Sequence, residues 1–142
     1  MEVTLSTPQS ALPGLARLGR PVRPALTGLA LISTQAELSV IDYQAAKILD
    51  LPVIDIAEAA ADAGKEMTGR DTAGRDTAGR DAHGIEVYAV HFSIASISFA
   101  RDLERVLGSS LGGSLVMVIG RDVLQECAFL YNGKHGEFTF FS

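Results

Sequence analysis

Apolar residues along this chain gather in short runs that have the length of β-strands and are separated by prolines, glycines and polar segments. Gly28–Ile32 and Leu115–Ile119 are continuous apolar runs, which is typical of buried strands. Glu2–Ser6 and Ile85–Phe92 are rich in β-branched or aromatic residues and partly alternate polar with apolar positions, as strands do. The pattern therefore predicts a mostly β fold.

Helical signals are few and short. Asp42 suits the N-cap of a helix at about residues 42–50. An alanine-rich stretch predicts another helix over residues 56–63, with Asp55 as its cap. A helical turn is predicted over residues 122–126. These helices are too short to change the fold class.

Prolines and glycines shape the two ends of the chain. The first 27 residues are predicted to form one strand and loops, because four prolines fix φ and remove backbone N–H groups: Pro8, Pro13, Pro21 and Pro24. At the other end, residues 128–131 and 138–141 predict a hairpin. Asn132-Gly133 lies between them and supplies the positive φ that tight turns need.

A tandem repeat fills the middle of the chain. The unit Gly-Arg-Asp-Thr-Ala occurs twice from Gly69 and is followed by a variant that ends at His83. A period of five fits neither helix nor strand, and the unit buries too little apolar surface to offset the entropy of ordering it. We therefore predict a flexible flap or loop region at about residues 55–84; a specialised binding loop is the alternative.

Composition predicts one domain and excludes several classes of function. With 142 residues, 47% of them hydrophobic, the chain suits a single domain over residues 1–142. The net charge of −5 and the scattered basic residues disfavour nucleic-acid binding. One cysteine and three histidines without ligand-like spacing predict no metal site and no cofactor. Without a leader pattern or an apolar run of membrane-spanning length, we predict a cytoplasmic protein with no membrane partner.

Two short segments near opposite ends of the chain carry a specific resemblance. Leu29–Ile32 leads into Ser33–Ala36 (Ser-Thr-Gln-Ala), and Val116–Ile119 leads into Gly120–Asp122 (Gly-Arg-Asp). In order and context they resemble the two signature halves of the retropepsin-like aspartic proteases, of the bacterial type. In that family one apolar strand ends in Asp-Thr-Gly-Ala and a later one runs into Ile-Gly-Arg-Asp. The match covers most of the chain, with the repeat where the family has its substrate-covering flap.

The resemblance implies a retropepsin-like closed β-barrel or sandwich with one or two short helices and half of an active site per chain. Two chains would form a homodimer around a two-fold axis and act on a polypeptide. In active members two carboxylates, one from each chain, share a proton and activate water. Catalytic positions are then implied for Ser33, Thr34 and Gln35, with Thr34 bonding across the axis. Substrate contacts are implied for Ala36, Glu37 and Ile119, and structural roles for Gly120, Arg121 and Asp122, with Arg121 paired to Glu37.

Two matched positions depart from the family pattern. Ser33 occupies the place of the catalytic aspartate, and its hydroxyl does not ionise near neutral pH. Gln35 replaces a glycine whose missing side chain lets substrate approach the backbone. We therefore predict a catalytically impaired pseudoenzyme that binds extended peptides in the dimer cleft. The alternatives are an active aspartic peptidase, through an unrecognised carboxylate or in a form with aspartate at position 33 and glycine at position 35, and a non-catalytic structural dimer.

Other residues that could supply catalytic chemistry lack the right surroundings. Asp71 and Asp76 each precede Thr-Ala, but they lie in the polar repeat rather than after a buried strand. A nucleophilic Ser33 would need His83 or His91 as its base, and no pattern in the sequence places either histidine beside it. Neither candidate replaces the missing aspartate.

Overall fold

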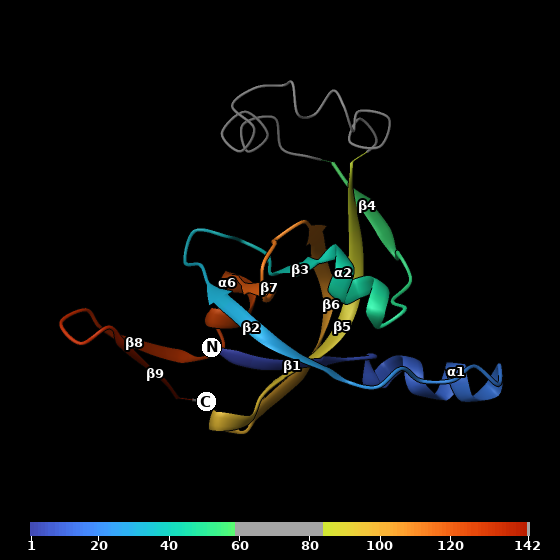
Figure 1. Ribbon diagram of the computed structural model, residues 1–142, viewed down its shortest axis with the longest axis horizontal. Helices are drawn as coiled ribbons and strands as arrows, with labels where there is room; N and C mark the ends of the chain where they lie inside the picture. The colour runs from blue at the N-terminus through green and yellow to red at the C-terminus, as the bar shows by residue number, and fades with distance from the viewer. Residues whose placement is uncertain (59–83, 142) are drawn as a thin grey trace.

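Six strands close a β-barrel at the centre of the computed structural model, which describes residues 1–58 and 84–141 (Figure 1). They are β1 (Glu2–Ser6), β2 (Leu26–Ile32), β3 (Val40–Asp42), β5 (Ile85–Ile94), β6 (Phe99–Ser109) and β7 (Leu115–Ile119). Neighbours follow the order β1-β2-β7-β3-β6-β5, and β5 pairs with β1 to close the ring. The predicted mostly β barrel is confirmed.

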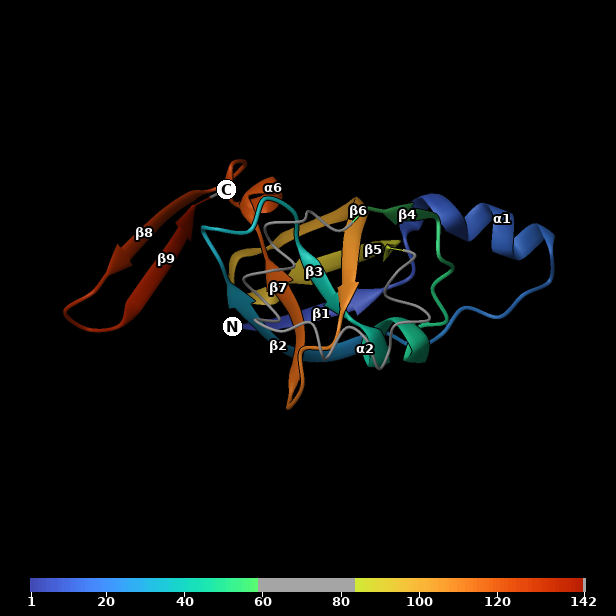
Figure 2. The same ribbon diagram turned by 90° about the horizontal axis from the view of Figure 1, so that it is seen from above.

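The other elements extend from this barrel. They are the 3-10 helices η1 (Gln9–Ala11) and η2 (Ala95–Ile97), the helices α1 (Leu12–Arg17), α2 (Tyr43–Ile48) and α6 (Arg121–Leu124), and the strands β4 (Asp55–Ala57), β8 (Ala128–Asn132) and β9 (Glu137–Phe141). In both views α1 and the β8–β9 hairpin project from opposite ends of the barrel (Figures 1 and 2). None of the helices within residues 1–58 and 84–141 is long and apolar enough to cross a membrane.

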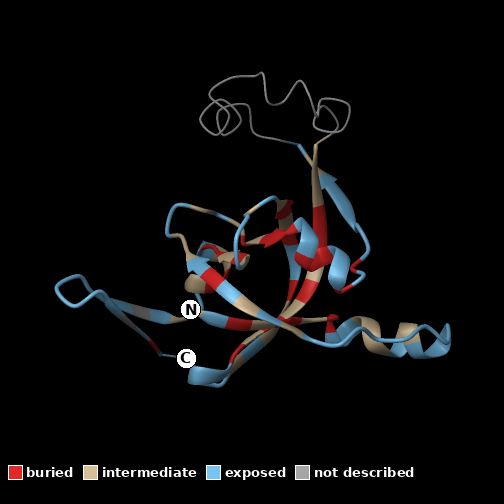
Figure 3. Cartoon of the chain, viewed as in Figure 1, coloured by how far each residue is buried: buried red, intermediate tan, exposed pale blue. Residues whose placement is uncertain are grey.

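The core lies inside the ring, where each strand contributes one face. Leu5, Ile41, Phe92, Val106 and Met117 come from five different strands and are fully buried. In β1 and over most of β5, buried residues alternate with less buried ones, as the geometry of a small barrel requires. Figure 3 shows this buried interior together with the exposed surfaces of the hairpin and of α1.

Several predicted elements are confirmed at close to their predicted bounds. Asp42 caps α2, because its carboxylate accepts a 2.8 Å hydrogen bond from the backbone N–H of Gln44. The turn predicted after residue 121 forms α6, and the predicted C-terminal hairpin forms β8 and β9. The first strand, Glu2–Ser6, has the predicted bounds.

The prediction that Gly28–Ile32 forms a buried strand is right about the strand and wrong about the burial. These residues belong to β2, but Leu29 is 44% exposed and Leu31 is 54% exposed, whereas Ala30 between them is buried. The strand lies in the wall of the barrel, so only one of its two faces meets the core. The apolar run therefore leaves leucine side chains on the outer surface.

The N-terminal prolines do not exclude a helix. Pro13 lies in the first turn of α1, where its missing N–H has no intrahelical partner to lose and its fixed φ suits the helix. Pro8 immediately precedes η1. The prediction of one strand and loops thus missed a short helix that begins at a proline.

Asp55 begins a strand and not the predicted helix. β4 pairs with β5 in antiparallel fashion, with Ile56 opposite Glu86. The Asp55 carboxylate accepts hydrogen bonds from the N–H of Ile56 and from Arg105, each at 2.8 Å. The rest of the predicted helix and the repeat, with Asp71, Asp76 and His83, lie in residues 59–83, outside the described part of the chain.

The C-terminal hairpin turns through a different glycine from the one predicted. The two strands are joined by residues 133–136, and the positive φ, +67°, belongs to Gly136. Asn132 instead accepts a hydrogen bond at its side-chain oxygen from the N–H of Lys134. A four-residue loop places the left-handed residue at its end, so Gly133 is free of that requirement.

Candidate functional site

The two resembling segments, far apart in the sequence, lie side by side in the structure. β2 and β7 are parallel neighbours, with Ile32 opposite Ile119. One residue later the N–H of Ser33 donates a 2.9 Å hydrogen bond to the carbonyl of Ile119. We call Ser33–Ser39 together with Gly120–Asp122 the motif junction. The pairing of the two strands delivers both halves of the junction to the same end of the barrel.

Ser33 opens a tight turn. Its hydroxyl oxygen accepts a 3.2 Å hydrogen bond from the N–H of Ala36, so the side chain closes the turn on itself. Ser33 and Ala36 are half-buried, whereas Thr34 and Gln35 are exposed. The two central residues of the turn are therefore open to solvent.

The second segment is bonded directly to this turn. The N–H of Arg121 donates to the carbonyl of Ala36 at 2.8 Å, and the N–H of Asp122 donates to the carbonyl of Glu37 at 3.1 Å. Gly120 makes this approach possible, because a Cβ there would lie 2.7 Å from the backbone carbonyl of Leu38. No side chain fits at that position without moving the backbone.

A buried serine, which the sequence analysis did not single out, completes the motif junction. Ser39 is fully buried, and its hydroxyl donates a 2.7 Å hydrogen bond to the Asp122 carboxylate. The same carboxylate accepts from the N–H of Ser39 at 3.0 Å, and the Ser39 oxygen accepts from the N–H of Gly120. No pattern in the sequence indicated this burial, because alternation places a polar residue between Leu38 and Val40 on the polar face.

Arg121 and Glu37 lie close enough to form the expected ion pair. The guanidinium and carboxylate are 3.2 Å apart, but their side chains are 54% and 84% exposed. Water and salt screen a pair of this kind, so its contribution to stability is below about 1 kcal/mol. The backbone hydrogen bonds, rather than this pair, hold the two segments together.

Ile119 does not fit the substrate contact that the resemblance implies. Its side chain is fully buried in the barrel core, because β7 lies in the wall between β2 and β3. Only its carbonyl takes part in the motif junction, as the acceptor for Ser33. Of the three residues with an implied substrate role, Glu37 is exposed and Ala36 is half-buried.

The acid that bonds the two segments of the motif junction, Asp122, is not free to act as a base. Asp122 accepts hydrogen bonds from Ser39 through both carboxylate oxygens and from the N–H of Val123 at 3.0 Å. These donors fix the carboxylate as part of the scaffold. No group of acidic, histidine or cysteine side chains in residues 1–58 and 84–141 is arranged to hold a metal ion.

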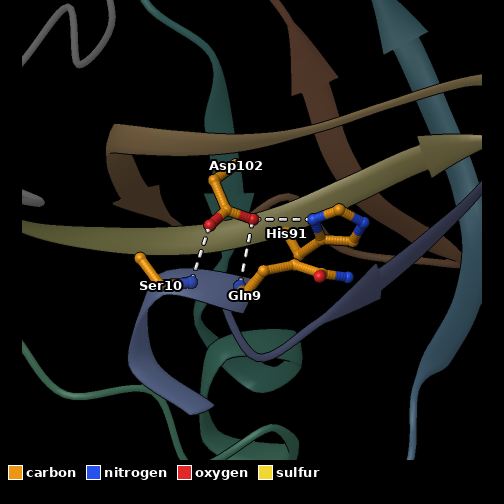
Figure 4. Close-up of polar contacts among 4 residues, drawn as sticks. All are labelled: Gln9, Ser10, His91 and Asp102. Atoms are coloured by element: carbon orange, nitrogen blue, oxygen red, sulfur yellow. Dashed lines mark hydrogen bonds and ion pairs between the residues drawn. The ribbon is translucent and has the colours of Figure 1, made fainter. Parts of the chain in front are cut away.

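His91 belongs to a different part of the molecule (Figure 4). Its Nδ1 lies 2.7 Å from Asp102, whose carboxylate also accepts hydrogen bonds from the N–H groups of Gln9 and Ser10. Burial opposes the ionised form of Asp102, but these hydrogen bonds outweigh it and lower the pKa of the carboxyl group.

The position of His91 gives no support to a serine–histidine pair. His91 is opposite Ser6, at the end of β1 that meets the start of β2, whereas Ser33 follows the other end of β2. The seven residues between these ends span roughly 23 Å at the rise of a β-strand. The other candidate base, His83, is among the residues outside the described part of the chain.

Comparisons with family models, with curated proteins and with solved structures found no match to this chain.

Proposed function

We propose that this chain is a retropepsin-like aspartic protease homologue that forms a homodimer and does not cleave peptides. The observation that carries the proposal is the motif junction, in which the two resembling segments are bonded to one another through the backbone and through Ser39 and Asp122. That contact joins the residues that would form one half of a two-fold site. Hydrolysis would require a matching carboxylate in each half.

The chemistry at position 33 argues against catalysis. The Ser33 hydroxyl accepts a hydrogen bond from Ala36 and cannot share a proton with a second copy of itself in the way that two carboxyl groups do. Gln35 is exposed at the centre of the turn, where it adds a polar side chain beside the proposed dimer axis. Water bound between two such turns would have no general base.

The C-terminal hairpin supports a homodimer. Leu130, Tyr131 and Phe141 on its two strands are 56–62% exposed. A two-stranded hairpin is at best marginally stable in water, and exposed aromatic residues of this kind are typical of interfaces. The hairpin leaves the barrel at the end where the turn after β2 lies (Figures 1 and 2). Pairing two hairpins around a two-fold axis would bring two copies of the motif junction towards one another.

The ligand that suits such a dimer is an extended polypeptide. Strand addition supplies main-chain hydrogen bonds, which require a fixed backbone more than a catalytic side chain. The polar exposed residues Thr34 and Gln35 lie at the turn that would face this ligand. In this proposal the cleft binds peptides without consuming them.

Mass spectrometry of a diverse peptide library at mildly acidic pH tests the proposal. We expect no cleavage by the chain itself and cleavage by the double variant Ser33→Asp, Gln35→Gly. The matched control is Ser33→Asn, Gln35→Gly, because asparagine has nearly the size of aspartate but cannot ionise. Cleavage by the chain as it stands would refute the inactive assignment and favour the active peptidase.

A non-catalytic structural dimer is the second candidate, and the exposed hairpin favours it independently of the motif junction. Two measurements separate the candidates when no variant cleaves. Sedimentation equilibrium gives the oligomeric state, and fluorescence anisotropy with labelled extended peptides reports binding in the cleft. A dimer that binds no peptide is a structural dimer, and a monomer contradicts both proposals.

A further inference from the structure

The segment Arg20–Ala25, which we call the proline arm, joins α1 to β2 and stands away from the barrel (Figures 1 and 3). Each of its six residues is exposed, and it belongs to no helix or strand. Among the described residues, no hydrogen bond or ion pair holds the side chains of Arg20 and Arg23. The arm contributes nothing to the core or to the motif junction, so its composition has to be explained in another way.

The end of α1 fixes where the proline arm begins. Gly19 has a φ of +66°, which glycine adopts without strain. The N–H of Arg20 donates to the carbonyl of Leu15 at 3.0 Å, and the N–H of Gly19 donates to that of Ala16 at 3.2 Å. This pair of bonds is the usual way to end a helix at a left-handed glycine. The backbone is therefore fixed up to the first residue of the arm.

The sequence of the proline arm favours a polyproline II conformation. Pro21 and Pro24 each fix φ near −65°, and a residue before proline is driven to extended ψ values. Arg20 and Arg23 are those preceding residues. Two residues are thus restricted in φ and two in ψ before any partner binds.

Three residues per turn arrange the side chains of the proline arm in ridges. Pro21 and Pro24 fall on one ridge, and Arg20 and Arg23 fall on a second. Val22, which is 50% exposed, lies on the third ridge. The arm therefore presents a rigid apolar edge beside a row of two guanidinium groups.

The positive charge of the proline arm and of the sequence around it favours a partner with an acidic surface. No acidic residue lies between Glu2 and Glu37, while Arg17, Arg20 and Arg23 lie within that interval of a chain whose net charge is −5. An isolated positive segment on an acidic protein is attracted to an acidic surface. Arginine also forms bidentate pairs with carboxylates.

We propose that the proline arm is a ligand for a protein domain whose groove is lined by aromatic side chains and bordered by carboxylates. The prolines pack on the aromatic rings, and the two arginines pair with the carboxylates. This is the mode by which grooves of this kind recognise Pro-x-x-P segments. Because the arm is already extended and joined to ordered elements on both sides, little conformational entropy is lost on binding.

The anchors on both sides of the proline arm strengthen this proposal. On the N-terminal side Asp102 holds the start of η1 through the N–H groups of Gln9 and Ser10, as Figure 4 shows. On the C-terminal side Leu26 enters the barrel and lies opposite Leu5. The arm is therefore attached at both ends to ordered parts of the protein.

The test uses the whole chain and a panel of purified SH3, WW and EVH1 domains that have a tryptophan in an acidic groove. The chain has no tryptophan, so a change in indole fluorescence during titration comes from the groove alone. Chemical-shift changes in the ¹⁵N-labelled chain show which of its own residues contact the domain. We expect saturable binding, with shifts centred on residues 18–25.

Two double variants separate the contribution of the prolines to binding from that of the arginines. Pro21→Ala, Pro24→Ala keeps both arginines, and Arg20→Glu, Arg23→Glu keeps both prolines; each is expected to weaken binding at least tenfold. Pro52→Ala and Lys47→Glu change an exposed proline and an exposed lysine elsewhere and should leave binding unchanged. Circular dichroism and amide spectra verify that every variant keeps the barrel.

Three results would overturn the proposal. One is the absence of binding to every groove at 0.5 mM, roughly the concentration at which weak millimolar complexes become visible. Another is a loss of binding in the arginine variant but not in the proline variant, which means simple charge attraction. The last is binding to phosphatidylserine vesicles in preference to the grooves, which makes the arm a membrane contact.

Discussion

The motif junction and the C-terminal hairpin are both built around β-strands, yet they are stabilised in opposite ways. At the junction, Ser39 is fully buried and the Asp122 carboxylate holds two segments that are 83 residues apart. In the hairpin, β8 and β9 pair with one another and with no other strand of the described residues, and Leu130 and Tyr131 are 62% and 60% exposed. The junction is complete within one chain, whereas the hairpin offers apolar surface that a second chain can bury.

The difference extends to how each region is joined to the barrel. The motif junction continues directly from β2 and β7, so the barrel fixes its backbone. The hairpin follows α6, and an ion pair between Arg101 on β6 and Glu126 lies close to its base. Substitutions in the motif junction should therefore change the free energy of unfolding. Substitutions in the hairpin should instead change the affinity between two chains.

The largest expected effect is at Gly120. In Gly120→Ala the new Cβ would lie 2.7 Å from the Leu38 carbonyl, and backbone cannot rotate aside as a long side chain can. We expect a loss of about 3 kcal/mol in the free energy of unfolding. Urea denaturation of this variant and of Gly133→Ala measures the contrast. In the hairpin the nearest atom to the added Cβ is 3.4 Å away, so an equal loss there would contradict the comparison.

Removing the Asp122 carboxylate ranks next. Asp122→Ala leaves the buried Ser39 hydroxyl and N–H without their acceptor, at an expected cost of about 2 kcal/mol. The hairpin control is Asn132→Ala, which removes one exposed bond to the N–H of Lys134 and should cost less than about 0.5 kcal/mol. Thermal unfolding of both variants at one protein concentration gives the ranking. Similar shifts in the two would mean that Asp122 is not central to the junction.

Substitutions in the hairpin should change the oligomeric state. Tyr131→Ser removes an exposed aromatic side chain from the proposed dimer contact, and we expect the dimer to dissociate at least about tenfold more readily. Circular dichroism of the barrel should stay unchanged. Sedimentation equilibrium provides the measurement, with Thr139→Ser on the same hairpin as the control. A dimer of undiminished affinity would place the interface elsewhere.

Acid should loosen a third contact, the one between Asp102 and η1. The hydrogen bonds from Ser10, His91 and Gln9 lower the pKa of Asp102, so it contributes stability above the carboxyl's unfolded pKa and loses it as pH falls through the lower folded pKa. We expect Asp102→Asn to cost about 1 kcal/mol at pH 7 and less below pH 4. Urea titrations from pH 7 to pH 3 measure this convergence. A gap that stays constant over that interval would contradict it.

The smallest effect is predicted for the Arg121–Glu37 pair. Both side chains are more than half exposed, so Glu37→Gln should change the free energy of unfolding by less than about 0.5 kcal/mol. High salt should remove even that difference. A loss of 2 kcal/mol, measured beside Asp122→Ala, would show that the ion pair and not the backbone network joins the two segments.

Much of the fold could be predicted from the sequence because local rules decided it. The strand-like runs at Glu2–Ser6 and Leu115–Ile119 have the predicted bounds, and Asp42 caps the helix that its position indicates. β6 was not singled out, since charged residues interrupt its apolar pattern. The helix expected to begin after Asp55 is wrong for its first residues, because Ile56 and Ala57 pair with β5, and its remaining residues lie outside the described part of the chain.

The candidate site divides in the same way. The resemblance implied that Ser33–Ala36 and Gly120–Asp122 belong together, and the residue type alone determined that Ser33 provides no carboxylate. Only the tertiary structure made Ser39 the buried partner of Asp122. It also decided between the burial of Ile119 that the apolar run indicated and the substrate contact that the resemblance implied. Residue types and short-range spacing are properties of the sequence itself, so they can be predicted without the tertiary structure. Which faces of β2 and β7 meet the interior depends on how six strands close into a ring, and no single segment contains that information.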